Sequence, residues 1–250
     1  MNSSVESIVP FNQFIDSAQG DHLDENRGDW LSEIKEKGRI EFYKLGWPSP
    51  KFESWRYTNL NKLAKTQFFL PQDIELAELP YQDILPVDAP KIALVNGKFN
   101  RELSDLSTIS EGILVNNFQE MSDEQRALFS LENPTTLPKE GLPVKALNDA
   151  LLSDVLFIEI RPGWQSDVPL HIVSIGFGDH VGFSSKIFVS AGENSHLDIV
   201  ESHAGEHGST YFSSCVSNID IKAGARLCLL YTSDAADDMQ CVDLGGRRII

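Results

Sequence analysis

The pattern with the most obvious chemical meaning in this sequence is formed by His203, Glu206 and His207, which together match H-x-x-E-H. In one class of zinc peptidases the two histidines of this pattern lie one helical turn apart and bind Zn²⁺, while the glutamate acts as general base. That geometry requires a helix. Gly205 and Gly208 disfavour one here, and the sequence on both sides is strand-like. We therefore predict a solvent-exposed loop instead of a zinc peptidase site.

Other side chains that bind metals or act as nucleophiles are isolated. His196 and Asp198 alternate with apolar residues, which places both on the outer polar face of a predicted strand. Cys215 lies in an apolar stretch and is predicted to be a small buried side chain, since a thiolate ligand needs a basic or metal partner. His171 lies on a predicted strand without a companion. The sequence therefore predicts no catalytic residue, no metal ligand and no cofactor-binding residue.

Composition and missing motifs narrow the class of protein further. The chain has 250 residues, 41% of them hydrophobic, and a formal net charge of -16, which argues against a nucleic-acid binder. Neither a G-x-x-x-x-G-K-[ST] loop nor a G-x-S-x-G elbow occurs, so no enzyme is predicted. No apolar run has the length of a signal or membrane segment, and the three cysteines form no CxxC pair. We expect a cytoplasmic protein.

The elements that must position these side chains repeat three times in the second half of the chain. A short strand-like stretch ends in a small-residue turn at Gly163, Gly192 and Gly224, which are spaced 29 and then 32 residues apart. A second apolar stretch follows each turn. Self-similarity at this period indicates stacked units that cannot bury their apolar faces alone, and the alternation of side chains indicates strands. The repeat therefore predicts a β-helix or a related β-solenoid.

The first part of the chain predicts helices. Residues 29–45 mix apolar and charged side chains at helical spacing, and Gly46 and Pro48 end this stretch. The aromatic cluster at residues 52–60 follows. We interpret its Trp55-Arg56-Tyr57 core as an anchor that fixes the helical domain to the rest of the protein, with ligand binding as the alternative.

Further elements are predicted between the helical region and the repeat. Residues 71–90 contain four prolines among acidic residues and are predicted to be a linker or an extended surface segment. The predicted elements after it are a strand at 91–95, a tight turn at Asn96-Gly97, a strand at 112–115, a capped helix from Ser122 to Phe129 and a short helix at 146–152.

Ordered motifs in the chain resemble one known family. Gly46-Trp47-Pro48 and the stretch Glu53-Ser54-Trp55-Arg56-Tyr57-Thr58-Asn59-Leu60 are similar to the N-terminal signature of the SufB/SufD family of iron-sulfur cluster assembly proteins. Val95-Asn96-Gly97-Lys98-Phe99, Leu103-Ser104, Glu111-Gly112-Ile113, Leu147-Asn148-Asp149-Ala150 and the repeats from Phe157 follow in the order found in that family. The resemblance covers about residues 30 to 227, and none of its motifs is catalytic.

The resemblance implies an architecture and partners. It implies a small helical N-terminal domain, a right-handed parallel β-helix core and a C-terminal helical domain that binds the ATPase SufC. It also implies that the β-helix pairs with SufB in a complex that builds and hands on iron-sulfur clusters. The cluster-forming residues of that pair lie mostly beyond the end of this chain, so no ligand is transferred and no cofactor is expected on this chain alone.

The predicted organisation is a mainly β protein with four segments. These are a helical domain at 1–70, a linker at 71–90, an incomplete β-helix core at 91–227 and a non-native tail at 228–250. From Cys228 the repeat and the family pattern are lost, and the remaining sequence resembles translated sequencing-adapter read-through. The alternative is a genuine exposed tail.

The predicted function is that of a non-enzymatic scaffold. In this interpretation a rigid solenoid face pairs with a homologous partner and holds partner residues in a fixed geometry for cluster assembly. The alternative is a carbohydrate-active β-helix enzyme of the polysaccharide-lyase type, because such enzymes carry acidic and basic residues on one solenoid face. Those enzymes are usually secreted, whereas no export signal is seen in this sequence.

Overall fold

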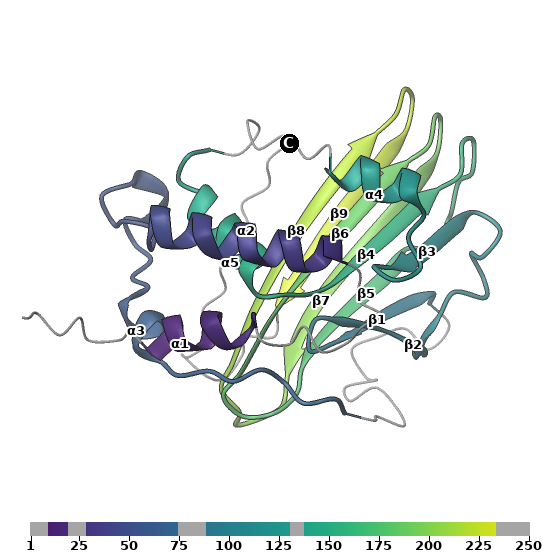
Figure 1. Cartoon of the computed structure of the whole chain (residues 1–250). Helices are drawn as coiled ribbons and strands as arrows, with labels where there is room; N and C mark the ends of the chain where they lie inside the picture. The colour runs from purple at the N-terminus through teal and green to yellow at the C-terminus, as the bar shows by residue number, and fades with distance from the viewer. Residues whose placement is uncertain (1–9, 20–28, 75–88, 131–137, 234–250) are drawn as a thin grey trace, which may run out of the picture. The chain divides into compact units, whose positions relative to one another are not determined.

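The computed structural model describes residues 10–19, 29–74, 89–130 and 138–233 (Figure 1). Within these ranges, helices and two mostly parallel sheets make the protein mixed α and β, so the prediction of a mainly β protein is corrected. The helices are α1 (Pro10–Ser17), α2 (Asp29–Leu45), α3 (Asn61–Lys65), α4 (Asp123–Ser130) and α5 (Leu142–Ala150), with a 3-10 turn η1 (Glu53–Trp55). The correction arises because α1 and α5 add helical residues that apolar periodicity in the sequence only partly indicates.

The chain divides into two compact units. The first, here called the helical unit, contains residues 1–70 and 134–151, and therefore takes in α1, α2, α3 and α5. The second, here called the sheet unit, contains residues 71–133 and 152–248, and takes in α4 and all the described strands. Most of the predicted linker at 71–90 and most of the predicted tail lie outside the described residues.

The helical unit is built around α2, the amphipathic helix that the sequence predicts. Gly38 lies where α2 crosses α5, and a Cβ atom on it would meet the Asp149 side chain and lie 2.6 Å from the backbone nitrogen of Ala150. The absence of a side chain at Gly38 therefore lets two helices approach closely enough to bury the face of α5 that carries Ala146, Leu147 and Ala150.

Gly38→Ala is expected to lower the free energy of unfolding by about 2 kcal/mol. Overpacking against backbone atoms, which cannot rotate away, costs up to about 3 kcal/mol, and about 1 kcal/mol of better helix propensity offsets it. Urea denaturation followed by circular dichroism measures the difference. Lys37→Ala is the matched control, because Lys37 is the exposed neighbour on the same helix. A Gly38→Ala variant as stable as this control would contradict the close crossing.

Aromatic rings fill the core of the helical unit. Phe11 makes edge-to-face contacts with Phe14, Trp47 and Phe68, and the ring of Phe42 makes a similar contact with Trp47. Phe11, Phe14, Phe42 and Phe68 are all almost completely buried. Such ring pairs add about 0.5–1.5 kcal/mol each beyond their buried area.

For the predicted aromatic anchor, the side-chain hydrogen bond that the structure describes lies within the helical unit. Trp55 is half-buried, and its indole Nε1 donates a hydrogen bond of 2.9 Å to the carbonyl of Glu140 within the helical unit. Arg56 is exposed, and Tyr57 is 90% exposed. The sequence identified an aromatic cluster correctly but could not show which rings face solvent, because the turn at η1 points neighbouring side chains in different directions.

The sheet unit contains two sheets whose strands alternate along the chain. The strands are β1 (Lys91–Val95), β2 (Lys98–Asp105), β3 (Ile113–Asn117), β4 (Leu152–Ile160), β5 (Leu170–Gly176), β6 (Val181–Ala191), β7 (His196–Gly205), β8 (Tyr211–Ile221) and β9 (Arg226–Ser233). One sheet has the order β2-β1-β5-β7-β9 and the other β3-β4-β6-β8. From β4 onward each strand pairs in parallel with the strand two positions later, so consecutive strands belong to different sheets (Figure 1).

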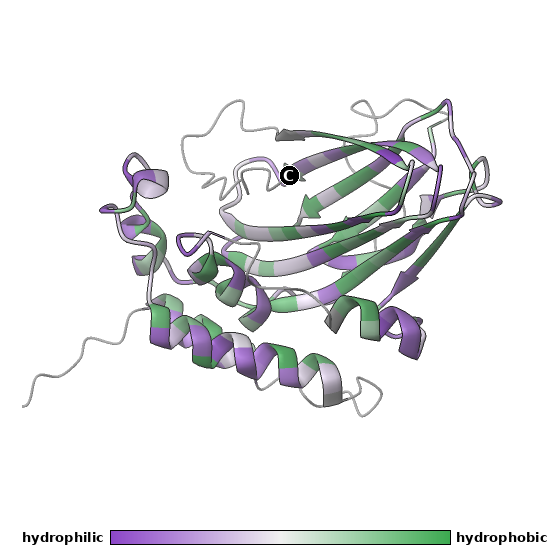
Figure 2. Cartoon of the chain, turned by 90° about the horizontal axis from the view of Figure 1, so that it is seen from above, coloured by the Kyte–Doolittle hydropathy of each residue, from purple (hydrophilic) through white to green (hydrophobic). Residues whose placement is uncertain are grey.

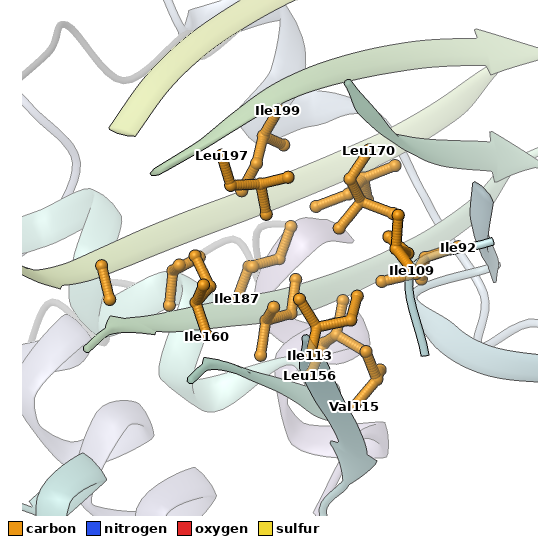
Figure 3. Close-up of a cluster of buried hydrophobic side chains, with 14 of the residues drawn as sticks. Ile92, Ile109, Ile113, Val115, Leu156, Ile160, Leu170, Ile187, Leu197 and Ile199 are labelled. Atoms are coloured by element: carbon orange, nitrogen blue, oxygen red, sulfur yellow. The ribbon is translucent and has the colours of Figure 1, made fainter. Parts of the chain in front are cut away.

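The core of the sheet unit comes from side chains that alternate along these strands. Hydrophobic and hydrophilic residues alternate in bands along several ribbons (Figure 2). The isoleucines and leucines of both sheets point toward one another in Figure 3, where Ile187 and Leu156 approach Ile199 and Leu170. All four are buried. Apolar side chains from two sheets therefore bury each other, as the sequence repeat predicts.

The three repeat glycines end their strands for two different reasons. Gly163 has φ 74° and Gly224 has φ 71°, a left-handed conformation that glycine adopts without strain. Gly192 is instead crowded, because a Cβ atom on it would lie 2.6 Å from the carbonyl oxygen of Ile160. Turn geometry and close approach both select glycine here.

The predicted end of the repeat at Leu227 is wrong. Strand β9 continues to Ser233 and pairs in register with β7, with Leu229 opposite Ile199 and Tyr231 opposite Glu201. Leu227 and Leu229 also pack against the apolar core. The strand continues because its apolar alternation extends past Leu227, although the resemblance to the family ends there.

Shorter elements complete the sheet unit as predicted. Asn96 and Gly97, with φ 48° and 77°, form the tight turn between β1 and β2. Ser122 and Gln125 form a reciprocal cap on α4, in which the Gln125 backbone nitrogen donates to the Ser122 hydroxyl at 3.2 Å and the Ser122 backbone nitrogen donates to Gln125 Oε1 at 3.1 Å. Among the described helices, none is long and apolar enough to cross a membrane.

Candidate functional site

A group of polar side chains lies on the inward face of the sheet unit, among the aliphatic ones. In β7 the inward residues are Leu197 and Ile199, which belong to the apolar core, followed by Glu201 and His203. In β8 the inward Cys215 packs against the same core. Glu201, His203 and Cys215 are here called the interior cluster.

Contacts within the interior cluster are short. Glu201 is 6% exposed, and its Oε1 lies 2.9 Å from Nε2 of His203. A buried carboxylate is costly without a partner, and the contact with His203 offsets the cost of burying Glu201 between the sheets. A small cavity lined by Glu201, Ser217 and aliphatic side chains adjoins the pair.

The Cys215 thiol is held in its protonated form. Loss of surrounding water is the main cause that raises the pKa of Cys215 well above its ordinary value, and the negative charge of Glu201 raises it further. Hydrogen bonds involving Ser185 and Ser217 act in the opposite direction but are weaker. Cys215 is therefore a poor nucleophile at neutral pH, since the thiolate is the reactive form.

Aromatic rings pack beside the interior cluster. A Cβ atom on Gly205 would meet the Tyr211 ring, and one on Gly176 would lie 2.7 Å from it, so Tyr211 covers two glycines of the facing sheet. Phe183 stacks parallel to Tyr211 with ring centroids 6.5 Å apart. The polar cluster is therefore bounded by the aliphatic core on one side and by rings on the other.

The interior cluster contains one hydrogen-bonded pair, Glu201 and His203, and a thiol whose pKa is raised by burial. Within the residues that the structure describes, no three histidine, cysteine, aspartate or glutamate side chains are arranged to hold a metal ion. The thiol is protonated, and the carboxylate is engaged by an imidazole. The cluster thus gives the chain a polar interior position without an evident nucleophile.

The structure separates the residues of the H-x-x-E-H motif. His203 lies in strand β7 and belongs to the interior cluster, whereas Glu206 lies in the loop that follows, where its carboxylate accepts a hydrogen bond from the Gly178 nitrogen at 3.2 Å. His207 is exposed. The segment forms a strand end and a loop, so the prediction that it is not a helix is confirmed. The prediction of a loop is wrong for His203, because β7 extends to Gly205.

The other predicted candidates are distributed over different places. Nε2 of His196 lies 3.4 Å from Oδ1 of Asp198, and the two side chains are 42% and 51% exposed. Both therefore lie on the outer face of the strand, as predicted. His171 lies on β5 and is 8% exposed, and burial lowers its pKa. Cys215 has the predicted contacts with the core but also has polar neighbours.

Sequence reasoning missed the interior cluster because Cys215 lies on a different strand from Glu201 and His203. The spacing of Glu201 and His203 places both on one face, and their common parity with Leu197 and Ile199 was the available signal for an inward orientation. Their proximity to Cys215 depends on how two sheets face each other, which no local pattern determines.

Comparison with known proteins identifies the family. The model of the SufBD protein N-terminal region matches residues 11–172, which is more than half of the chain. The chain therefore belongs to the SufB/SufD family of iron-sulfur cluster assembly proteins.

One relative is the iron-sulfur cluster assembly protein SufD of Escherichia coli (strain K12), which is 24% identical over 218 residues. The matched region covers 84% of this chain and 48% of that protein, so the chain spans about half the length of this relative. The resemblance to the family seen in the ordered motifs is thereby confirmed.

The raised pKa of Cys215 predicts a loss of stability in alkaline solution. The unfolded thiol releases its proton near pH 8.5, whereas the folded thiol retains it, so the free energy of unfolding falls as pH rises above that value. The slope from this group approaches about 1.4 kcal/mol per pH unit.

Urea denaturation between pH 7 and pH 10 measures this slope. The Cys215→Ala variant is expected to show a smaller decline than the unchanged chain, because it lacks the shifted thiol while Cys228 remains in both. If the free energy of unfolding fell equally with pH in both proteins, the Cys215 thiol would not be shielded from water.

Proposed function

We propose that this chain is part of a non-enzymatic scaffold and interaction subunit of the SUF iron-sulfur cluster assembly complex. The observation that carries the proposal is the family match, which spans both the helical unit and the beginning of the sheet unit. The similar protein SufD is described by its name as an iron-sulfur cluster assembly protein. The protonated Cys215 is compatible with this role, because a scaffold needs no reactive thiol within this segment.

In this proposal the two sheets are faces of a right-handed parallel β-helix. Consecutive strands alternate between the sheets, and each pairs in register with the strand one repeat later. Like side chains therefore stack on neighbouring repeats: Phe157 lies opposite Phe188 in the register, and their rings are parallel. Stacked repeats of this kind give a rigid face, which is the property a scaffold requires.

The proposed partners are SufB and the ATPase SufC. SufB would pair with the β-helix, and SufC would bind a C-terminal helical domain outside this chain. Apolar side chains are exposed on β8, where Ile219 is 41% and Ile221 51% exposed, and they would be available to such a partner. The cluster would form at the level of the complex, which we place in the cytoplasm.

Co-expression tests this function. The full-length protein that contains this chain is expressed with a tag, together with SufB-like and SufC-like proteins from the same source, and purified under anaerobic conditions. We expect stoichiometric co-purification of both partners, ATP hydrolysis that requires the SufC-like protein, and cluster reconstitution that requires all three. The same experiment without the tagged protein is the control.

Two results would overturn the proposal. One is a tagged protein that purifies without either partner and does not affect cluster reconstitution. The other is release of unsaturated uronate from a polysaccharide by the purified protein, which would support the β-helix lyase alternative. That alternative gains no support from the family match.

A further inference from the structure

The helical unit carries a short aromatic turn whose rings face solvent. Between α2 and α3, Phe52 is 41% exposed and Tyr57 is 90% exposed, which is unusual for large rings on a folded surface. Neither ring contributes to the aromatic core of this unit. The sequence motif that contains them therefore presents two large rings to solvent.

The backbone of this turn is held in place, so the exposed rings are presented in a defined position. The Trp55 nitrogen donates to the Phe52 carbonyl at 3.0 Å, and the Thr58 nitrogen donates to the Trp55 carbonyl at 3.1 Å. The Trp55 indole also donates to the Glu140 carbonyl at 2.9 Å. A surface that is already ordered loses less conformational entropy when it binds.

Positive charge accompanies the exposed rings. Residues 51–57 carry two basic residues and one acidic residue, Glu53, a formal charge of +1, and Lys62 and Lys65 on α3 bring residues 51–70 to +3 in a chain of -16. The basic residues, all exposed, are Lys51, Arg56, Lys62 and Lys65. The Arg56 guanidinium lies 5.6 Å from the centre of the Tyr57 ring, which places a cation and an aromatic face together.

We propose that the turn formed by residues 51–57, here called the aromatic turn, is a docking site for an acidic segment of a partner protein. A carboxylate of that segment would pair with Arg56, and an apolar side chain beside it would pack on Tyr57. Arginine and tyrosine are among the residues that contribute most to protein interfaces. Charge selects the partner, because an acidic segment is attracted to this turn and repelled by the rest of an acidic chain.

Nucleic acid is the less favoured occupant. A polyanion as long as an oligonucleotide would extend past the local charge of +3 and meet the negative field of the remaining chain. A short acidic peptide segment requires only a few cations, and Lys51 and Arg56 in the turn, with Lys62 and Lys65 on α3, supply them. The inference does not depend on the identity of the complex proposed above.

Site-specific photo-crosslinking in cells tests the docking site. A benzophenone amino acid is placed at Tyr57 of the full-length protein, and cross-linked peptides are identified by mass spectrometry. We expect one recurrent partner peptide with an excess of aspartate and glutamate and at least one apolar residue. Arg56→Glu in the same protein is expected to reduce this product at least tenfold, and Arg56→Lys to preserve most of it.

The control positions and probes decide between outcomes. The same benzophenone at Leu114, an exposed residue of β3, should not capture that peptide. The identified peptide, made synthetically with a fluorophore, should bind the purified protein, and its Gln/Asn counterpart should bind at least tenfold more weakly. No recurrent peptide, a neutral or basic peptide, or stronger binding of a single-stranded oligonucleotide of the same length would overturn the proposal. Unchanged circular dichroism of the Arg56 variants excludes unfolding as the cause.

Discussion

Phe157→Ala is expected to lower the free energy of unfolding of the sheet unit by about 4 kcal/mol. Phe157 is fully buried, and its ring stacks on Phe188 with centroids 5.1 Å apart and planes only 5° from parallel. Replacing a buried phenylalanine by alanine costs about 3–5 kcal/mol through lost transfer energy and the cavity left behind. The stack adds to this cost, since the two rings lie on neighbouring strands in register.

Urea denaturation measures this loss as a shift of the midpoint at an unchanged slope. Phe157→Leu is expected to lose only about 1.5 kcal/mol, because it preserves most of the buried volume. Leu114→Ala is the exposed control in the same unit, since Leu114 is 47% exposed, and its effect should stay within about 0.5 kcal/mol. If Phe157→Ala and Leu114→Ala were equally stable, the stacked core would not contribute as described.

Asp154→Ala is expected to lower the free energy of unfolding by about 3 kcal/mol. One carboxylate oxygen of Asp154 accepts a hydrogen bond from the Phe99 nitrogen at 3.1 Å, and the other accepts bonds from the Phe118 and Val155 nitrogens at 3.2 and 2.8 Å. Phe99 lies in β2 and Phe118 follows β3, so one side chain joins three segments. Leaving buried donors without acceptors costs about 1–3 kcal/mol each.

Two variants separate the carboxylate from its volume. Asp154→Asn keeps one oxygen acceptor and should lose roughly half as much stability as the alanine variant. Asp167→Ala removes an exposed carboxylate and should remain within about 0.5 kcal/mol of the unchanged chain. Thermal unfolding followed by circular dichroism provides an independent measure. An Asp154→Ala variant that lost less than about 1 kcal/mol would show that water replaces the carboxylate.

The sequence predicts elements whose signals are local. The cap of α4 follows from Ser122 and Gln125, whose reciprocal hydrogen bonds were expected from their spacing alone. The turn at Asn96-Gly97 follows from residues that accept a left-handed backbone. The alternation in β4 to β9 follows from a repeat in which each strand shows the same apolar parity. These features need no knowledge of the chain's distant parts.

Features that depend on contact between distant segments were not predictable from patterns. The role of Gly38 became visible only when α5, more than a hundred residues later, was found against α2. Tyr57 looked like an anchor because large rings are usually buried, yet its turn directs it to solvent. Prediction of the interior cluster would have required knowledge of how the two sheets face each other. In each case the missing information was the position of a second element in space.

The parallel pairing of β4 through β9 also bears on how this protein emerges from the ribosome. Strand β6 finds its partner β4 about thirty residues earlier in the nascent chain, and β7, β8 and β9 each find theirs at a similar distance. Each newly synthesised strand therefore has a finished edge to join as soon as it leaves the exit tunnel. Synthesis and folding of this region can therefore proceed in the same direction, from β4 toward β9.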